Sequence, residues 1–423
     1  MTRLRFIHAA DLHLDSPFRG LHRIAPEIAG DLYKATFDAY EKIVGLCIEE
    51  QVDALLVAGD IFDGADRSLR AQLKFVAGLN RLEEKGIRSF ICHGNHDPLN
   101  GWEAQLSLPA GCHRFGAKVE GVPIFPGEPE RAVVYGISYP QREVRENLTP
   151  FFGRVKQGPF TIGLLHANVD NNTDHDSYAP CTLNDMEHTG INYWALGHIH
   201  TRQILREVNP TVVYPGNPQG RHPSERGARG VYLVEVKDSN QIHLEFRAVD
   251  VVRWELLEVN IGDPDTDQAL LDAIDQKVAA CQDAAEGRSI IFRLVLIGRG
   301  TLHYSLMRPQ FVDAILERIN DTWAQQRPFL WCEGIQTATG APIDRQQRRQ
   351  GTDFVGDLIR LCDESRENPN ILAKMRETLE LLYTRGNAGQ YLRNHLPSDD
   401  ELCALLVGAE EICLTELLKD DDQ

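Results

Sequence analysis

The sequence predicts an α/β (α+β) fold: a two-sheet core flanked by helices, then a small α/β domain and a helical C-terminal region. Three observations support this prediction. Strand and helix patterns alternate up to residue 93, which is typical of an α/β arrangement. Closely spaced strand patterns continue to about residue 250, which favours a second sheet. The pattern then changes twice, so we expect domains at 1–250, 251–335 and 336–423.

Short apolar segments of the first domain have the length and composition of buried strands. Two helical patterns separate the first three of these segments, at about 31–50 and 67–85. A polar turn between the apolar segments 230–236 and 241–249 predicts a hairpin. The other expected strands are 4–10, 53–58, 88–93, 131–137, 160–166 and 193–196.

After residue 250 the segments WELLEVNI and SIIFRLVLIG read as strands, and each is followed by an amphipathic helical pattern. This region is therefore expected to form a compact β-α-β-α unit. Beyond residue 336 three helical stretches carry wide apolar faces, which would either pack on one another or dock a partner. These stretches are VGDLIRLCDE, NPNILAKMRETLELLYTR and SDDELCALLVGAEEICLTELL.

The composition is that of an ordinary globular protein, with 42% hydrophobic and 25% charged residues. No apolar run approaches the roughly 18 residues of a membrane span, so we expect no membrane association. Nine isolated cysteines and an N-terminus unlike a signal peptide predict a cytoplasmic protein with reduced thiols. The net charge of −18 disfavours binding nucleic acid through overall charge. A nucleic-acid role would need local basic patches or a partner.

Potential metal ligands stand at or just past the ends of five predicted strands. D-L-H at 11–13 and H-I-H at 198–200 each place two of them at positions i and i+2, which share one side of an extended chain. Any single motif is more simply a polar surface turn, but five in series favour a metal site, because binding groups gather at one end of an α/β sheet. The candidates are Asp11, His13, Asp60, Asn95, His166, His198 and His200.

The candidate ligands are carboxylate, amide and imidazole groups without a thiolate. This donor set suits Mn²⁺, with Fe or Zn as alternatives, better than an all-oxygen calcium site or a structural zinc site. Seven ligands are too many for one ion and suitable for two, as in centres that clamp a nucleophilic and a phosphoryl oxygen. Asp60 is the natural bridging carboxylate because it is the single isolated aspartate in the series.

The motif order D-x-H, GD-x-x-D, GNHD, H and GHIH resembles the calcineurin-like metallophosphoesterases over about residues 5–250. The resemblance implies the two-sheet core of that family and a pair of divalent metal ions. It assigns one ion to Asp11, His13, Asp60 and His200, and the other to Asp60, Asn95, His166 and His198.

The same resemblance assigns a catalytic pair. His96, in GNHD, would contact the scissile phosphate and protonate the leaving oxygen. Asp63, in GDIFD, would orient His96, since a carboxylate fixes the tautomer of an imidazole and raises its pKa. The alternative for Asp63 is a turn residue or a helix N-cap.

Three further stretches, FIHAADLHLDSPFRGL, HDSYAPC and YPGNPQGRH, resemble the SbcD-type DNA repair exonucleases, in particular the YhaO-like bacterial subgroup. This resemblance implies a phosphodiesterase that acts on DNA as an exonuclease or endonuclease in repair or processing. It also implies a capping role for 251–335, docking of 336–423 onto an SMC-like coiled-coil ATPase, and a homodimer joined through the phosphoesterase domain.

A local basic segment follows the GNP turn and could hold DNA phosphates without reading sequence. The alternative is a solvated loop. Its basic residues are Arg221, His222, Arg226 and Arg229.

Two other functions remain open. A phosphodiesterase or phosphatase acting on small nucleotides or phosphoproteins would use the same ligands, and the acidic charge favours it slightly. A non-catalytic regulator of an ATPase would be expected to have lost ligands, and none of the seven is missing.

Overall fold

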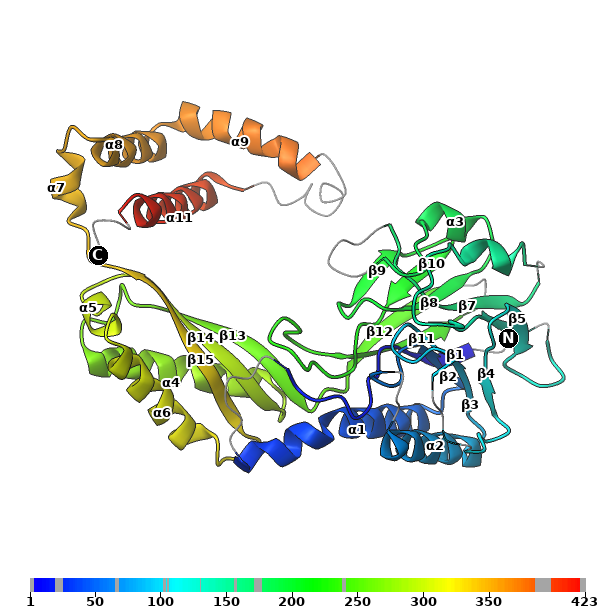
Figure 1. Cartoon of the computed structure of the whole chain (residues 1–423). Helices are drawn as coiled ribbons and strands as arrows, with labels where there is room; N and C mark the ends of the chain where they lie inside the picture. Colours follow the sequence, from blue (N-terminus) through cyan, green and yellow to red (C-terminus); the bar gives the residue numbers. More distant parts are fainter. Residues whose placement is uncertain are drawn as a thin grey trace. The chain divides into compact units, whose positions relative to one another are not determined.

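The computed structural model describes residues 4–19, 26–64, 68–101, 104, 106–129, 131–155, 158–170, 177–237, 241–384 and 397–418. His175 and Asp176 of the HDSYAPC stretch lie outside these described residues. The chain forms two compact units, each assembled from several segments (Figure 1). The first comprises Met1–Leu256, Cys281–Arg293 and Ile319–Glu333, and the second comprises Leu257–Ala280, Leu294–Arg318 and Gly334–Gln423.

The first sheet consists of β1 (Leu4–Ala9), β2 (Ala54–Ala58), β3 (Arg88–Cys92), β4 (Cys112–Arg114), β11 (Gly230–Val236) and β12 (Ile242–Ala248). Its strand order is β12-β11-β1-β2-β3-β4. The strands β1 to β4 run parallel, while β11 pairs antiparallel with β1 and forms the predicted hairpin with β12. The carboxyl ends of β1, β2 and β3 therefore share one edge of the sheet.

The second sheet consists of β5 (Glu120–Pro123), β6 (Ala132–Gly136), β7 (Phe160–His166), β8 (Tyr193–Gly197), β9 (Gln203–Arg206) and β10 (Thr211–Tyr214). Its strand order is β5-β6-β7-β8-β10-β9. The four central strands run parallel, and β5 and β9 pair antiparallel at the two edges. The carboxyl ends of β7 and β8 again lie side by side.

Alternation along β1 explains how the two sheets and the helices make one core. Phe6 packs between the sheets with Leu164 of β7. Ile7 points to the other face, where it packs with Tyr40 of α1 (Pro26–Glu49) and Leu79 of α2 (Leu69–Glu84). Successive strand residues face opposite sides, so one short apolar strand serves both layers. The predicted two-sheet core flanked by helices is confirmed.

A third layer covers the outer face of the second sheet. Trp194 of β8 is fully buried there, and its ring lies 4.8 Å from that of Phe152, measured between centroids. Phe152 ends a short 3-10 helix (Thr149–Phe152), and α3 (Leu183–Glu187) contributes Leu183 to the same apolar cluster. This layer packs against the face of β7 and β8 that points away from the first sheet.

A three-stranded sheet follows, in the order β13-β14-β15. The first residues of β13 pack against α1, since Val252 and Trp254 share an apolar cluster with Ile28 and Leu32. The predicted boundary at residue 250 therefore falls beside a continuous core, and the domain limits stay a prediction. The elements are β13 (Val252–Asn260), α4 (Asp267–Ala284), β14 (Ser289–Arg299), α5 (His303–Leu306), α6 (Pro309–Trp323) and β15 (Leu330–Gly340).

The C-terminal region is helical, as predicted, and contains α7 (Arg345–Arg349), α8 (Phe354–Glu367), α9 (Pro369–Thr384) and α11 (Asp399–Leu417). The helices α8 and α11 pack through Ile359 and Leu414. Leu361, Leu405 and Ile412 are nevertheless more than half exposed. Among the described residues, no helix combines the length and apolarity that crossing a membrane requires.

Some elements differ from the sequence prediction. The helix α1 begins at Pro26 rather than near residue 31, which suits the preference of proline for the first helical turn. The short strands β4, β5, β9 and β10 and the long strand β15 were not predicted. Four of these five strands have only three or four residues, too few for alternation to stand out.

Candidate metal centre

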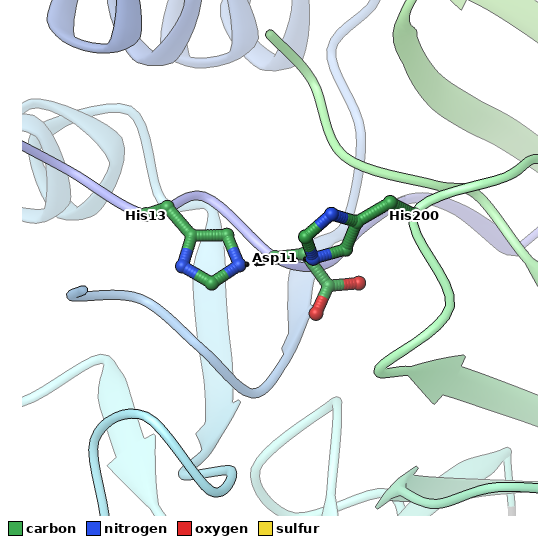
Figure 2. A group of neighbouring side chains, drawn as sticks. All are labelled: Asp11, His13 and His200. Carbon is green, nitrogen blue, oxygen red and sulfur yellow. Dashed lines mark hydrogen bonds between the residues drawn. The ribbon is translucent and has the colours of Figure 1, made fainter. Parts of the chain in front are cut away.

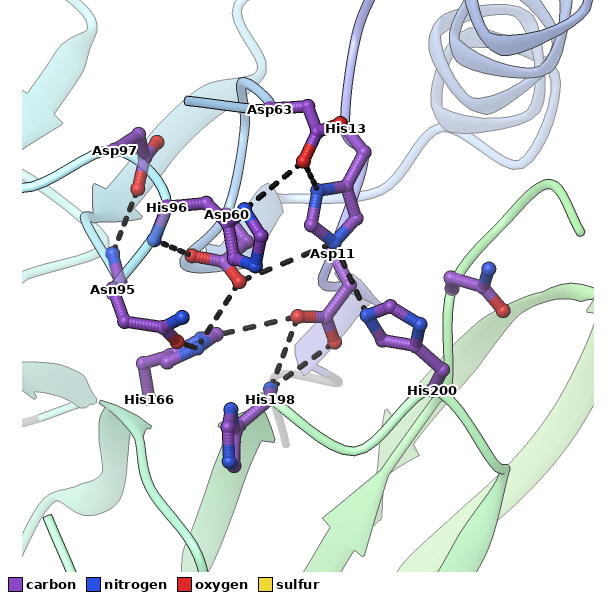
Figure 3. Close-up of polar contacts among 12 residues, drawn as sticks. Asp11, His13, Asp60, Asp63, Asn95, His96, Asp97, His166, His198 and His200 are labelled. Atoms are coloured by element: carbon purple, nitrogen blue, oxygen red, sulfur yellow. Dashed lines mark hydrogen bonds and ion pairs between the residues drawn. The ribbon is translucent and has the colours of Figure 1, made fainter. Parts of the chain in front are cut away.

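The end of β7 and the loops that follow β1, β2, β3 and β8 meet at one place and bring the predicted ligands together (Figure 3). The backbone of the first loop lies along the second, where Asp11 N–H donates to Gly59 O at 3.1 Å and His13 N–H donates to Asp60 O at 3.0 Å. Ligands that are far apart in the sequence therefore become neighbours because both sheets direct parallel strands to this edge.

One group of donors consists of Asp11, His13 and His200, whose potential ligand atoms lie within 4.8 Å of one another (Figure 2). The Nε2 atoms of the two histidines are 3.1 Å apart. Asp11 and His13 are buried, and His200 is partly buried. Two imidazole nitrogens that face each other beside a carboxylate form a donor set that fits a cation.

A second group consists of Asp11, Asp60 and His166, all buried. His166 Nε2 lies 3.4 Å from Asp60 Oδ2 and 3.0 Å from Asn95 Oδ1. Asp60 Oδ2 also lies 4.0 Å from His13 Nε2 in the first group. Asp60 of the second group thus also lies near the first, and Asp11 is common to both groups.

His198 lies beside the second group. Its ring centroid is 5.2 Å from that of His166, and its side chain is buried. Its backbone N–H donates to both carboxylate oxygens of Asp11 at 3.1 Å. His198 therefore holds Asp11 through its main chain and brings its imidazole to His166.

Burial shifts the pKa values of the carboxylates and imidazoles in opposite directions. It raises the pKa of Asp11 to about 6 and lowers the pKa of His13 to about 3. Carboxylates removed from water in this way are costly unless a cation compensates them. The buried donors, which converge from four loops and the end of β7, therefore fit a pair of divalent metal ions.

His96 and Asp63 form, with His13, a third group of potential donors at the margin of the first two. His96 Nδ1 lies 2.9 Å from Asp63 Oδ1, and the His96 side chain is 35% exposed, whereas that of His13 is 1% exposed. The His96 backbone N–H donates to Asp60 Oδ1 at 2.9 Å. Burial opposes protonation of His96, but the hydrogen bond to Asp63 and the charge of Asp60 outweigh burial and raise its pKa. This imidazole can reach a substrate from solvent.

The turns that carry the ligands need special backbone geometry. Asp11, Asp60 and His198 have φ values of 52°, 49° and 104°, in a region that L-residues rarely adopt. A Cβ at Gly197 would lie 1.7 Å from Ala58 O, so β8 can approach β2 only with glycine here. Strain of this kind is concentrated at functional sites.

Comparison with known proteins identifies the family. Residues 4–202 match the calcineurin-like phosphoesterases, and residues 254–340 match the middle domain of the metallophosphoesterase YhaO. "Uncharacterized metallophosphoesterase YhaO" of Bacillus subtilis is 38% identical over 333 residues, which cover 78% of this chain and 81% of that protein. The chain belongs to the calcineurin-like metallophosphoesterase family.

More distant relatives of this metallophosphoesterase are named as a DNA repair protein and as a nuclease subunit. The DNA double-strand break repair protein Mre11 of Sulfurisphaera tokodaii is 25% identical over 207 residues, 49% of this chain and 51% of that protein. One component of the nuclease SbcCD of Bacillus subtilis is 23% identical over 276 residues, with coverages of 56% and 68%. With the family match, these relatives make the chain a metal-dependent phosphoester hydrolase.

Several residues of the metallophosphoesterase site were missed by the sequence analysis. Glu225 Oε1 lies 2.6 Å from His200 Nδ1, and Ser16 Oγ donates to Asp63 Oδ2 at 2.7 Å. Asp97 joins two loops by accepting from the N–H groups of Ile61 at 2.9 Å and Gly94 at 2.8 Å. The GNHD motif could have identified Asp97. No motif could have identified Glu225, because it stands among basic residues.

The basic segment of the metallophosphoesterase does not form one surface patch. Arg229 is buried, and its guanidinium donates to His200 O and to Asn217 Oδ1, which favours a structural role. Arg221 is 11% exposed and lies 3.5 Å from Asp63 Oδ2. Only His222 and Arg226, among the four predicted residues, are exposed.

Proposed function

We propose that this chain is a two-metal phosphodiesterase that cleaves DNA, as an exonuclease or endonuclease in repair or processing. The observation that carries the proposal is the His96–Asp63 pair beside two convergent donor groups. The His96 side chain is 35% exposed, whereas the predicted ligands around it are mostly buried. Relatives named as a DNA double-strand break repair protein and as a nuclease subunit support a DNA phosphodiester as the substrate class.

In this proposal each donor group holds one ion. Asp11 is common to both groups, and Asp60 would serve both ions because its carboxylate lies between His13 and His166. One ion would be held by Asp11, His13, Asp60 and His200, and the other by Asp60, Asn95, His166 and His198.

Bound divalent ions would polarise the phosphoryl group and lower the pKa of a water molecule. The chain itself supplies the proton for the leaving oxygen. Asp63 holds Nδ1 of His96, so Nε2 of His96 is left to donate to the departing ribose oxygen. The backbone bond from His96 to Asp60 fixes the acid relative to the ligands.

The substrate would also meet cations on the surrounding loops. His222 and Arg226 are the exposed members of the predicted basic segment and would hold DNA phosphates without reading sequence. Arg19 is 69% exposed, and its guanidinium lies 3.4 Å from Asp63 Oδ2, which places a further positive charge beside the acid. Arg221 would contribute through Asp63 rather than through the substrate.

The ions are manganese in this proposal, because the donors are oxygen and nitrogen without a thiolate, a set that Fe or Zn also tolerates. The partner would be an SMC-like coiled-coil ATPase docked on the C-terminal helices, where Leu361, Leu405 and Ile412 are exposed. A homodimer and a cytoplasmic location complete the proposal. Light scattering and co-purification from cells test the assembly state and the partner.

The decisive experiment incubates the purified chain and Mn²⁺ with DNA labelled at either end, with and without the co-purifying ATPase. We expect degradation of the DNA, and a loss of about 10²–10⁴-fold in turnover for His96→Ala at unchanged metal content. Release of an ion by His96→Ala would show that the assigned roles are wrong.

A second candidate is a phosphodiesterase or phosphatase for small nucleotides or phosphoproteins, favoured by the net charge of −18. The two candidates differ in their response to bis-p-nitrophenyl phosphate, a small chromogenic diester. Rapid hydrolysis of this compound, with DNA left intact in the presence of the ATPase, would replace the nuclease proposal by the second candidate.

A further inference from the structure

The two ring nitrogens of His200 face different partners. Nε2 points into the first donor group and lies 3.1 Å from His13 Nε2 (Figure 2). Nδ1 lies 2.6 Å from Glu225 Oε1. A carboxylate accepts the N–H of the nitrogen that it faces, so the lone pair of His200 is left on Nε2, on the side of the donor group.

Two of the other proposed histidine ligands, His166 and His13, have the same orientation, with longer contacts at Nδ1. His166 Nδ1 lies 3.0 Å from the backbone oxygen of Ala58, and His13 Nδ1 lies 3.4 Å from Asp63 Oδ1. Glu225 makes the shortest of these three contacts, and it is a charged acceptor. A charged acceptor increases the basicity of the opposite ring nitrogen as well as fixing the ring.

Glu225 is itself held on two sides. Its Oε2 accepts the backbone N–H of Arg221 at 2.7 Å, and its own N–H donates to His222 O at 2.9 Å. Only 11% of its side chain is exposed. The carboxylate therefore has one position, fixed by the turn from Arg221 to Glu225.

Gln219 anchors this turn to the start of β13. Its Oε1 accepts the N–H of Val251 at 2.9 Å, and its Nε2 donates to Val252 O at 2.6 Å. Trp254 Nε1 donates to Gly220 O at 3.2 Å. The turn is thus supported by buried partners within the same compact unit, in a way that does not depend on substrate.

From these contacts we infer that Glu225 is a positioning residue, which fixes the tautomer and the direction of His200 and so sets the affinity of one of the two metal positions. The inference rests on the ligand role proposed for His200 and does not depend on DNA being the substrate. Because Glu225 lies within the basic segment, this segment would also help to position a metal ligand.

The test measures Mn²⁺ binding to the full chain by calorimetry, without substrate. We expect Glu225→Gln to weaken one of the two sites about 10- to 100-fold, the usual effect of removing such a partner. Glu187→Gln is the matched control, because it removes the charge of an exposed glutamate paired with Arg206, and it should bind as the wild type does. Thermal unfolding of the metal-free proteins checks that both variants fold.

A double-mutant cycle separates positioning from a general structural effect. In a His200→Ala background, Glu225→Gln should change Mn²⁺ affinity by less than about twofold, because its effect passes through His200. An equal loss in both backgrounds, or wild-type affinity in Glu225→Gln, would overturn the inference. Absence of DNA cleavage by a wild type that binds two ions would instead count against the nuclease proposal alone.

Discussion

Several proposed ligands combine their chemistry with an unfavourable backbone conformation. Asp11, His13 and Asp60 each have a φ near +50°, which costs an L-residue roughly 1–2 kcal/mol. Hydrogen bonds between the first two loops offset this cost, as in the bond from Leu14 N–H to Ile61 O at 2.9 Å. The strained backbone directs side chains from different strands toward one point. The effect of a substitution on metal binding should therefore be measured separately from its effect on the backbone conformation.

His198→Ala should remove one of the two ions and nearly all activity, because its imidazole is the group beside His166 in the second donor set. The Asp11 contact is made by the His198 backbone and should survive. Metal content after Mn²⁺ loading and desalting measures the effect. His188→Ala, at an exposed histidine, is the control, and two retained ions in His198→Ala would remove it from the ligand set.

Gly197→Ala should destabilise the protein by about 1–3 kcal/mol or more, since a Cβ would meet Ala58 O at 1.7 Å. Gly45→Ala, within α1, has open space around the new Cβ and should stabilise by up to about 1 kcal/mol. Urea unfolding measures both changes. Equal stability of the two variants would mean that β8 and β2 can separate without cost.

At the residue scale the candidate ligands could be predicted, because ligand-type residues recur at strand ends with glycine beside them. The residues that position these ligands could not be predicted. Glu225 and Ser16 contact His200 and Asp63 across the fold, and no periodicity relates such pairs. Arg229 has the same charge as its exposed neighbour Arg226, and only the structure separates the buried residue from the exposed one.

At the scale of elements, most long apolar strands and amphipathic helices could be predicted, but short edge strands and the 11-residue strand β15 could not. The strands β7 and β11 each have seven residues, enough to reveal their apolar character. The strand β9 has four residues, none of them fully buried, so its sequence resembles a polar loop. Its position depends on antiparallel pairing with β10, the next strand along the chain.

The C-terminal helices are joined by an ionic cluster as well as by apolar contacts. Glu410 of α11 is 4% exposed and pairs with Arg345 at 2.7 Å and with Arg366 at 3.1 Å. Asp363 of α8 lies 2.5 Å from Arg345 and 2.8 Å from Arg366. The two carboxylates therefore share two arginines that link α7, α8 and α11.

The hydrogen bond from Arg345 lowers the pKa of Asp363, so this contact stabilises the helices above the unfolded pKa of about 3.9. The stabilisation should be lost as the pH falls through the lower folded value. Asp363→Asn should therefore be less stable than wild type at pH 7, by about 1 kcal/mol, and the difference should shrink in strong acid. Denaturant unfolding at several pH values measures it, and a constant difference would contradict this origin.

For the whole molecule, the net charge of −18 limits how DNA can be held. Exposed arginines on the loops around the site, such as Arg19 and Arg226, offer few phosphate contacts. Non-specific DNA affinity comes mainly from such contacts. The acidic chain should therefore bind DNA weakly by itself and gain affinity from a partner.

The salt dependence of binding tests this expectation. For His96→Ala with duplex DNA, the slope of log K against log salt should be no steeper than about −3, because each phosphate contact contributes about −0.9. Fluorescence anisotropy between about 50 and 200 mM salt gives the slope. A value of about −6 or steeper would require a basic surface beyond these loops.

The packing of Val252 and Trp254 against α1 has a consequence for how genes of this family can be rearranged. Ile28 and Leu32 would be left facing water if the chain were cut after the hairpin, and exposed apolar surface of this kind promotes aggregation. A recombination joint at residue 250 would thus separate two halves of one hydrophobic cluster. The segments on either side of residue 250 are therefore expected to fold as one unit.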